Sequence, residues 1–200
     1  MDFEIFISEK PLDGREIKEI KGLPVLTPVQ VHGSSVYFVG RRVKTPPRAD
    51  ALITDNKNFW VGVLTADCLP VFLIGEGAVG VVHAGWRGTL KGITFNAATY
   101  MARFTKVKRA ILGVGICRAC YEVGEEVKRA FPKEYEKCFI PQKNGKFLFD
   151  LKEANRVQLK AAGVEIIADL GLCTVCNNDR FYSYRKEKTD KRILSAVRIL

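Results

Sequence analysis

Short apolar runs separated by turn residues organise the first half of the chain. Val, Ile, Leu and Phe concentrate within the runs, and Gly, Pro or Asp residues lie between them. This is the pattern of β-strands joined by turns. It predicts strands over residues 3–7, 25–31, 35–39, 50–54, 59–65, 70–74 and 78–83.

The second half mixes helical and strand patterns. Apolar residues recur at helical spacing on one stripe from Trp86 onward, and Asn144-Gly145 indicates a hairpin-like turn. The patterns predict helices over 86–104, over 122–131 with a stop at Phe131-Pro132, and from the N-cap Asp150 to the stop at Gly163. Further strands are predicted over 109–113, 164–167 and 192–199. Together the elements predict an α/β (α+β) fold, a single-domain layered sandwich of mixed β-sheets covered by helices over residues 1–200.

Composition agrees with a globular domain. The chain has 200 residues, of which 47% are hydrophobic, so it can bury a substantial core. No apolar run approaches the length of about 20 residues that a bilayer span needs. The start carries acid where a signal peptide would carry base. We expect a cytoplasmic monomer that does not insert in a membrane.

The net charge of +10 leaves two interpretations. Lys and Arg outnumber Asp and Glu by 32 to 22, but they occur in small groups with acids interspersed: Arg41-Arg42, Lys106-x-Lys108-Arg109 and Arg185-Lys186-x-Lys188. A solvated basic surface fits this distribution, and a steering field for anionic ligands is the functional alternative. No specific binding of nucleic acid is expected.

The chain has only two histidines, His32 and His83, and each follows an apolar run at a glycine turn. Cys68 lies at a similar strand exit. Two imidazoles and a thiolate are ligands for zinc or copper, and three protein ligands with an open fourth position are typical of a catalytic metal site. Because no local metal-binding spacing links the three, hydrogen-bonded turn histidines and a small buried cysteine remain an equal alternative.

Four of the six cysteines form two Cys-x-x-Cys pairs, Cys117/Cys120 and Cys173/Cys176. They resemble two zinc knuckles, yet the gap between the pairs is far longer than in a compact zinc ribbon. Three interpretations stay open: a structural zinc site, a redox or disulfide pair, and inert thiols. Inert reduced thiols are favoured, because the chain has enough core residues to fold without disulfide bonds. Cys138 is interpreted as a packing residue.

Several motifs in order resemble the YfiH family of laccase-domain, or polyphenol-oxidase-like, proteins. The strongest are Thr65-Ala66-Asp67-Cys68-Leu69-Pro70-Val71 and His83-Ala84-Gly85-Trp86-Arg87-Gly88. Other matching pieces are Gln30 to Val36, Ala49 to Thr54, Cys120 to Gly124, Cys173-Thr174 and Phe181 to Arg185. The resemblance implies a layered α/β sandwich with mixed sheets and a metal held at the positions of His32, Cys68 and His83.

The chain departs from the family pattern at three places. Gly113-Val114-Gly115 stands where Gly-Pro is common, Cys117 occupies a place that is often glycine, and Thr189-Asp190-Lys191-Arg192 lacks the glycine expected before the arginine. The last departure puts a phosphate-loop role for that turn in doubt.

The resemblance implies a zinc-dependent purine nucleoside phosphorylase acting on adenosine, inosine and 5′-methylthioadenosine, with adenosine deaminase activity. Deamination suits a metal that lowers the pKa of water from about 15.7 toward 7. Asp67 is the first candidate for carrying protons, and a turn cap is its alternative role.

Phosphorolysis requires donors for phosphate and a surface for the purine. Arg87, one turn after His83 at a predicted helix start, is the first candidate for phosphate and Arg185 the second, and both also fit a solvated surface. Trp86 could stack on the purine or simply pack in the core.

Other function classes remain. A copper-dependent polyphenol oxidase is one, although two histidines are too few for several coppers. A noncatalytic zinc or nucleic-acid-binding module that uses the Cys-x-x-Cys pairs is another, and a Cys68/His83 cysteine hydrolase is a weaker fourth class.

Overall fold

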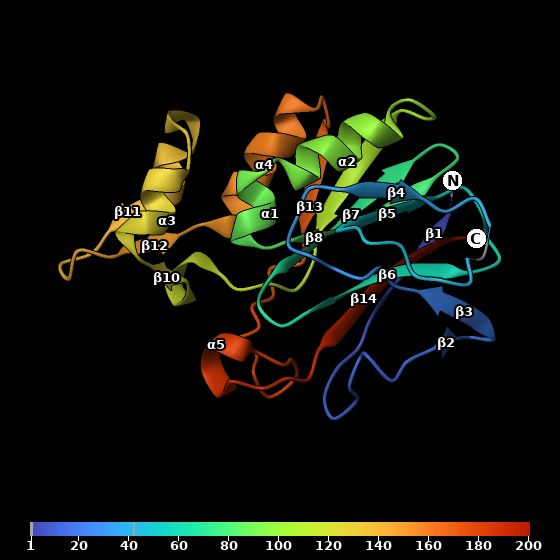
Figure 1. The fold of residues 1–200 in the computed structure, drawn as a ribbon, viewed down its shortest axis with the longest axis horizontal. Coiled ribbons are helices and arrows are strands. Elements are labelled where there is room, and N and C mark those ends of the chain that lie inside the picture. Colours follow the sequence, from blue (N-terminus) through green and yellow to red (C-terminus); the bar gives the residue numbers. More distant parts are fainter. Residues whose placement is uncertain (1, 42) are drawn as a thin grey trace.

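Two β-sheets lie face to face, and helices cover the outer face of the larger one (Figure 1). The computed structural model describes residues 2–41 and 43–200, so Met1 of the opening run and Arg42 of the basic Arg41-Arg42 pair lie outside the described residues. The larger sheet has six strands in the order β13 (Ile166–Asp169), β9 (Val107–Leu112), β7 (Leu69–Gly75), β8 (Val79–Ala84), β5 (Ala51–Thr54) and β4 (Val36–Phe38).

The second sheet has five strands in the order β1 (Phe3–Ile7), β14 (Ile193–Ile199), β6 (Trp60–Thr65), β3 (Leu23–Leu26) and β2 (Glu19–Ile20). Both sheets are mixed, because β3 pairs with β6 and β4 with β5 in parallel, whereas β14 pairs with β6 and β7 with β8 in antiparallel. Fully buried residues such as Val63, Phe72 and Val81 fill the space between the sheets. The predicted sandwich of mixed sheets covered by helices is therefore confirmed.

The helix predicted over 86–104 is wrong as one element, since it splits into α1 (Trp86–Leu90) and α2 (Ile93–Met101). Gly92 between them adopts a left-handed conformation with φ of 77°, which a helix interior does not allow. Periodicity continues across the break because both helices face the same sheet. Phe104 lies beyond α2 with 56% of its surface exposed, so it does not extend the buried stripe.

A buried polar network locks α1 and α2 against α4 (Leu151–Ala161). Gln158 donates to the carbonyl of Thr89 at 2.6 Å and accepts from the backbone N–H of Thr94 at 3.1 Å. Asn155 accepts from the Thr94 hydroxyl at 2.6 Å. The Asp150 side chain accepts from the backbone N–H of Glu153 at 2.9 Å, which confirms the predicted N-cap.

A three-stranded sheet projects at one side, with β12 (Phe147–Phe149) between β10 (Glu122–Val123) and β11 (Phe139–Pro141). The helix predicted over 122–131 is correct only for α3 (Glu125–Ala130), because its first two residues pair as β10. A 3₁₀ segment, η2 (Lys133–Cys138), follows. The hairpin turn at Asn144-Gly145 is confirmed between β11 and β12.

The remaining predicted strands agree to within about two residues, except for 25–31. There β3 ends at Leu26, and the chain continues as a loop that reaches His32. Four short elements were not predicted from the sequence: β2, the 3₁₀ segments η1 (Arg118–Cys120) and η2, and α5 (Tyr184–Glu187). Among the described residues, no helix has the length and apolar character needed to cross a membrane.

Candidate functional site

Strand register brings Cys68 and His83 to one edge of the six-stranded sheet. Pro70 in β7 pairs with His83 in β8, so Cys68, two residues before Pro70, lies beside the end of β8. On the other side of β8, Ala51 of β5 pairs with Val82, and the backbone N–H of His83 donates to the carbonyl of Asp50 at 2.7 Å. The antiparallel pairing thus places three polar side chains at the same sheet edge.

The loop that follows β3 completes the cluster with His32. The candidate ligand atoms of His32, Cys68 and His83 all lie within 4.8 Å of one another. The two imidazole rings meet edge to face, with centroids 4.8 Å apart and an angle of 69° between the planes. His32 adopts a positive φ of 54°, which is uncommon for a residue with a side chain. The structure therefore brings together the predicted trio, whose metal-binding role stays a prediction.

Asp50 orders both histidines and was missed in the sequence assignment of the site. Its fully buried carboxylate accepts from His83 Nδ1 at 2.8 Å and from the backbone N–H groups of His32 at 3.0 Å and Gly33 at 2.7 Å. Because Nδ1 of His83 is engaged, Nε2 is left for a ligand. The only signal was its position in the motif Ala49 to Thr54.

Charges within the cluster stabilise one another. Burial alone would raise the pKa of Cys68, but the charge of His83 and the hydrogen bond with His32 outweigh it and bring this pKa to about 6. Burial alone would lower the pKa of His83, yet the Cys68 thiolate and Asp50 raise it to about 9. At neutral pH the Cys68 thiolate therefore faces the protonated His83 ring. A divalent cation bound to His83 would replace the ring proton that faces Cys68.

Gly85 shows how tightly the backbone approaches these side chains. A Cβ at this position would lie 2.8 Å from the Sγ of Cys68 and 3.4 Å from Nδ1 of His32. Only glycine leaves both atoms in place, so the turn after β8 is fitted around them. The donor set of one thiolate and two imidazoles suits zinc or copper rather than the hard cations magnesium and calcium.

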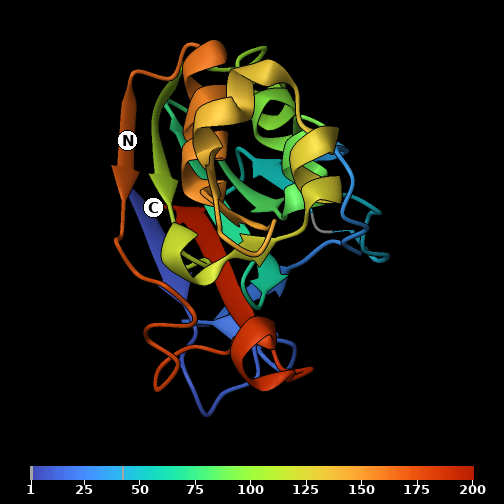
Figure 2. The same ribbon diagram turned by 90° about the vertical axis from the view of Figure 1, so that its left-hand side faces the viewer.

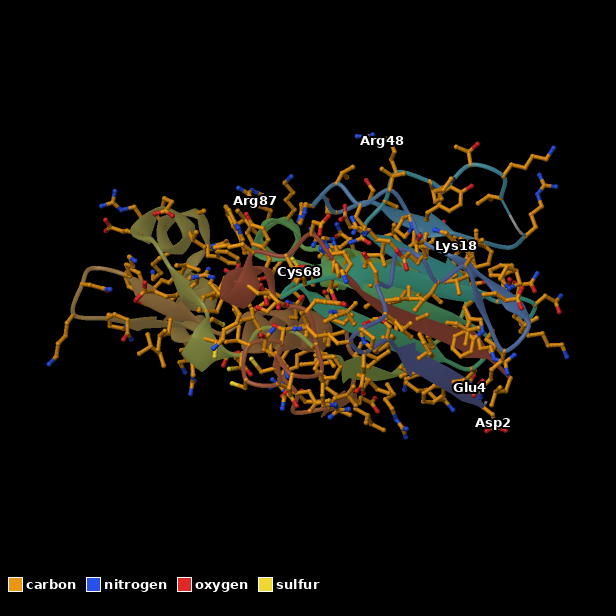
Figure 3. The ribbon with its side chains drawn as sticks, turned by 90° about the horizontal axis from the view of Figure 1, so that it is seen from below. Asp2, Glu4, Lys18, Arg48, Cys68 and Arg87 are labelled. Carbon is orange, nitrogen blue, oxygen red and sulfur yellow. The ribbon has the colours of Figure 1, made fainter. Side chains whose placement is uncertain are left out.

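The trio lines a cavity of about 640 Å³, a size typical of small-molecule sites. All the predicted site residues border it. Two of them, Cys68 and Arg87, are labelled in Figure 3. Its wall also carries aromatic rings and four arginines against two acids. These residues are Arg15, Arg87, Arg185, Arg192, Trp86, Tyr121, Tyr184, Asp67 and Asp190.

Arg87 is the arginine most available to a ligand. Its guanidinium carbon lies 4.4 Å from the centroid of the half-buried Trp86 ring, and within residues 2–41 and 43–200 it makes no side-chain hydrogen bond or ion pair. The predicted helix that carries Arg87 at its start is short: α1 spans only five residues, so its N-terminus contributes little to anion binding. The side chain itself remains the candidate.

Arg185 also borders the cavity but is already held. Its Nη1 donates to the carbonyl of Glu122 at 2.8 Å, and its guanidinium lies 5.3 Å from the ring centroid of Tyr121. The aromatic ring that Arg185 packs against is thus that of Tyr121.

Asp67 ties the loop before β7 to the segment before β14. Its Oδ1 accepts from the hydroxyls of Thr174 at 2.6 Å and Ser183 at 2.7 Å, and its Oδ2 accepts from the backbone N–H of Arg185 at 2.6 Å. Its φ of 96° lies in the region that residues with side chains rarely adopt. Positioning is therefore one clear role of this carboxylate, and its role as a proton carrier stays a prediction.

Further cavity residues were not identified from sequence. The Thr65 hydroxyl is buried and has no hydrogen-bond partner among the described residues, so it is available to a ligand. Gln30 fixes the strand end by accepting from the N–H of Leu64 and donating to its carbonyl, both at 2.8 Å. Burial and the nearby Cys68 raise the pKa of Tyr121, which therefore keeps its proton. All three lie in the family motifs, but threonine, glutamine and tyrosine at these positions do not by themselves indicate a chemical role.

The four cysteines of the Cys-x-x-Cys pairs also meet, with all four Sγ atoms within 4.8 Å of one another. The long sequence gap between the pairs had argued against a compact zinc ribbon. The two pairs meet nevertheless, because β9 and β13 are parallel neighbours and bring them to the same sheet edge. Whether they bind metal, form disulfides or are inert stays open at this point. Cys138 is buried in the core, in agreement with a packing role.

Comparisons with known proteins agree with this geometry. The sequence pattern of the family described as "Multi-copper polyphenol oxidoreductase laccase" matches residues 15–199. A purine nucleoside phosphorylase of Aquifex aeolicus is 37% identical over 179 residues, which cover 88% of this chain and 83% of that protein. Adenosine deaminase RL5, from an unknown prokaryotic organism, is 40% identical over 148 residues, covering 68% of this chain and 56% of that protein.

A solved structure shares the architecture as well. The crystal structure of the Bacillus licheniformis protein YfiH matches with a TM-score of 0.79 and 28% identity, covering 88% of this chain and 74% of that one. Sequence pattern, relatives and fold coincide over most of the chain. The chain is therefore a member of the YfiH family of laccase-domain proteins.

Proposed function

We propose that this chain is a zinc-dependent purine nucleoside phosphorylase. It acts on adenosine, inosine and 5′-methylthioadenosine, giving ribose 1-phosphate and the free base, and it also deaminates adenosine. The observation that carries the proposal is the meeting of His32, Cys68 and His83 in one cavity with Arg87 and Trp86. The names of the phosphorylase and deaminase relatives point to the same chemistry.

The donor set supports zinc at the trio. His32, Cys68 and His83 would hold the ion, and Asp50 would keep His83 oriented for it. When bound there, zinc supplies a Lewis acid that makes water nucleophilic near neutral pH.

Phosphorolysis replaces the bond between C1′ of the ribose and the purine nitrogen with a bond from C1′ to a phosphate oxygen. Arg87 binds the phosphate, because its N–H groups lack partners in the described chain and can form charge-assisted hydrogen bonds. Trp86 and Tyr121 offer ring surfaces for the purine. The unpartnered Thr65 hydroxyl provides a further hydrogen bond to the nucleoside.

Deamination needs a group that moves protons between the attacking water and the leaving ammonia. Asp67 is proposed for this, since it borders the cavity and its Oδ2 accepts a single hydrogen bond within the described part of the chain, from the Arg185 backbone. A second lone pair on that oxygen remains for substrate. The same loop contacts explain why Asp67 would also hold the cavity wall.

The cavity draws residues from both sheets and from the segment before β14, from Arg15 to Arg192. This supports the proposal that residues 1–200 act as one catalytic domain.

A copper-dependent polyphenol oxidase is the second candidate, supported by the printed description of the family. Multicopper oxidation requires ligands for several coppers. The sequence has two histidines, and both belong to the trio, which supports the nucleoside reactions over this alternative.

Product analysis tests the proposal. Zinc-reconstituted and chelator-treated protein are incubated with adenosine, inosine or 5′-methylthioadenosine, with and without phosphate, and the products are identified by mass spectrometry. Ribose 1-phosphate that forms only with phosphate and zinc supports phosphorolysis, and inosine formed from adenosine without phosphate supports deamination. Oxidation of a phenol by copper-loaded protein without any nucleoside turnover would instead favour the oxidase.

A further inference from the structure

We propose that the chain has a second metal site, a structural zinc held by four cysteine thiolates. The ligands come from two loops, and their Sγ atoms lie within 4.8 Å of one another: Cys117, Cys120, Cys173 and Cys176. None of these residues belongs to the trio of His32, Cys68 and His83. Four thiolates and no open position are the ligand set of a structural zinc rather than a catalytic one.

The sulfur spacing fits a metal better than a disulfide. The Sγ of Cys176 lies 3.9 Å from that of Cys117 and 3.6 Å from that of Cys120. A tetrahedron with zinc–sulfur bonds of about 2.3 Å has sulfur-to-sulfur edges of about 3.8 Å. A disulfide needs about 2.05 Å between one pair of sulfurs and leaves the other two apart. Here one sulfur is at the tetrahedral distance from two others at once.

Backbone groups point at the most buried of the four sulfurs. The N–H groups of Cys117 and Cys176 donate to the Sγ of Cys173 at 3.3 Å and 3.5 Å. The backbone N–H of Cys173 in turn donates to the side chain of Asn177 at 3.1 Å, which fixes the turn that carries Cys176. Such donors orient a ligating thiolate and offset its negative charge.

The topology explains why two distant segments supply one ligand set. Strands β9 and β13 are parallel, with Leu112 opposite Asp169, so the loops after them leave the same edge of the sheet (Figure 2). An additional bridge joins Gly115 to Cys173 beyond the strand ends. Each loop therefore presents its Cys-x-x-Cys turn to the other. A metal between the turns would clamp the two loops together.

A metal bound by the four cysteines would also stabilise the wall of the substrate cavity. Thr174, between ligands Cys173 and Cys176, donates its hydroxyl to Asp67 at 2.6 Å. Tyr121, directly after ligand Cys120, lines the cavity. The four-cysteine site is therefore assigned a positioning role: it holds in place the two segments that support Asp67 and the aromatic wall.

Metal counting tests the site independently of any enzymatic activity. Purified wild-type protein should contain about two zinc ions per chain by elemental analysis, one in each ligand set. His83→Ala should retain one zinc, and Cys176→Ser should also retain one. Cys138→Ala is the matched control, because Cys138 lies outside both ligand sets, and it should retain two zinc ions.

Cobalt identifies which set holds the retained ion. Cobalt-loaded His83→Ala should show the intense sulfur-to-metal charge-transfer absorption of four thiolates, and cobalt-loaded Cys176→Ser should show the weaker absorption of a single thiolate. Removal of zinc from His83→Ala should lower its melting temperature by about 10 °C or more, since the clamp then opens. This readout requires no variant of the cysteines, so a folding defect in Cys176→Ser cannot hide the answer.

Two outcomes would overturn the site. One is a wild-type protein with a single zinc that His83→Ala removes completely. The other is a chain that is lighter by two hydrogens and has lost two free thiols, which would show a disulfide in the cluster. If two zinc ions are found but no nucleoside turnover, the second site stands and the proposed function fails.

Discussion

The Asp50 carboxylate receives the Nδ1–H of His83 and the backbone N–H of His32 on the same oxygen, at 2.8 Å and 3.0 Å. One buried side chain therefore sets the ring orientation of one histidine and the loop position of the other. The backbone of this loop is paired on either side of His32, by the Val29–Arg48 bridge and at the Ser35 carbonyl, and the Asp50 carboxylate links His32 itself to His83.

Replacement of Asp50 by Asn should weaken zinc binding at the trio about 10- to 100-fold. The amide accepts only on its oxygen, so His83 and the three loop N–H groups, those of Val31, His32 and Gly33, cannot all be satisfied. Competition with a chromophoric chelator measures the affinity, with Asp55→Asn, an exposed site, as the control. Unchanged affinity in Asp50→Asn would show that the buried carboxylate does not orient the ligands.

The same carboxylate should shape stability in acid. Burial opposes its ionisation, but the bonds from His83 and Gly33 prevail and keep the pKa of Asp50 below its ordinary value. This contribution is complete above the ordinary pKa of about 3.9 and is lost as pH falls through the lowered one. Urea unfolding of metal-free protein from pH 7 to pH 3 should therefore show a steeper acid loss in wild type than in Asp50→Asn.

Gly85→Ala should disturb the trio without changing its ligands. The new Cβ would meet the Cys68 sulfur at 2.8 Å and push it away from the histidines. We expect zinc content at this site to fall several-fold, whereas Gly77→Ala, which places its Cβ in open space, should leave it unchanged. Elemental analysis of the two variants, each with His83 intact, measures this. Equal zinc content in Gly85→Ala and Gly77→Ala would contradict the close fit of Gly85 to the Cys68 sulfur.

In metal-free protein, Cys68 should react with iodoacetamide far below the pH expected for a thiol. Its pKa of about 6 means that the thiolate fraction rises through pH 6 and is nearly complete by pH 7. Burial raises the pKa of Cys138 to about 12, so that residue should stay unlabelled. Peptide mass spectrometry gives the site-resolved rates. In His83→Gln, the Cys68 midpoint should move upward, and an unchanged midpoint would refute the role of the imidazolium.

Arg87→Ala should reduce phosphorolysis at limiting phosphate about ten- to a hundredfold, because it removes a charge-assisted contact worth about 1.5 to 3 kcal/mol. Zinc content and phosphate-independent deamination should persist. Arg103 provides a matched control, since it also stacks on an aromatic ring, that of Tyr100 at 5.5 Å, but does not line the cavity. If Arg87→Ala leaves the phosphate dependence intact, Arg185→Ala is the next variant.

Binding to random duplex DNA should be weak and should vanish by about 0.2 M salt, because a few phosphate contacts release few counterions. Four arginines converge on the cavity instead, which favours small anions over a long polyanion. Fluorescence anisotropy with a labelled duplex at two salt concentrations measures this. Tight binding at the higher salt would instead support the interpretation of the chain as a nucleic-acid-binding module.

Local patterns were informative wherever structure depends on near neighbours. Buried strands such as β7 and β8, the Asp150 cap and the turn at Gly145 follow from residue types a few positions apart. The break at Gly92 was missed because both sides of it keep an apolar face toward the same sheet. Glycine alone does not predict a left-handed residue, since its tertiary surroundings decide between helix continuation and a turn.

The candidate metal ligands of the site could be predicted from the sequence, but the residues that hold those ligands in place could not. His32 and His83 stand out because the chain has only two histidines, Cys68 because it lies at a similar strand exit, and all three because they lie in the family motifs. Asp50 looks like an ordinary strand-end acid until β5 is paired with β8. The four cysteines meet only through the pairing of β9 with β13, whose partners Arg109 and Ile166 are far apart in sequence. The order of strands in a sheet cannot be predicted from any short stretch of the sequence.

The pairing of β14 with β6 also affects how the protein reaches its working state. Strand β6 leads directly into Cys68, yet its neighbours in the five-stranded sheet are β3 and β14, and β14 spans Ile193–Ile199. During synthesis the loop of Cys68 emerges more than a hundred residues before β14, the strand that pairs with β6. Contacts of such long range close slowly. The surroundings of the trio should therefore be complete only after β14 has left the ribosome, so binding of the proposed metal is expected late in folding.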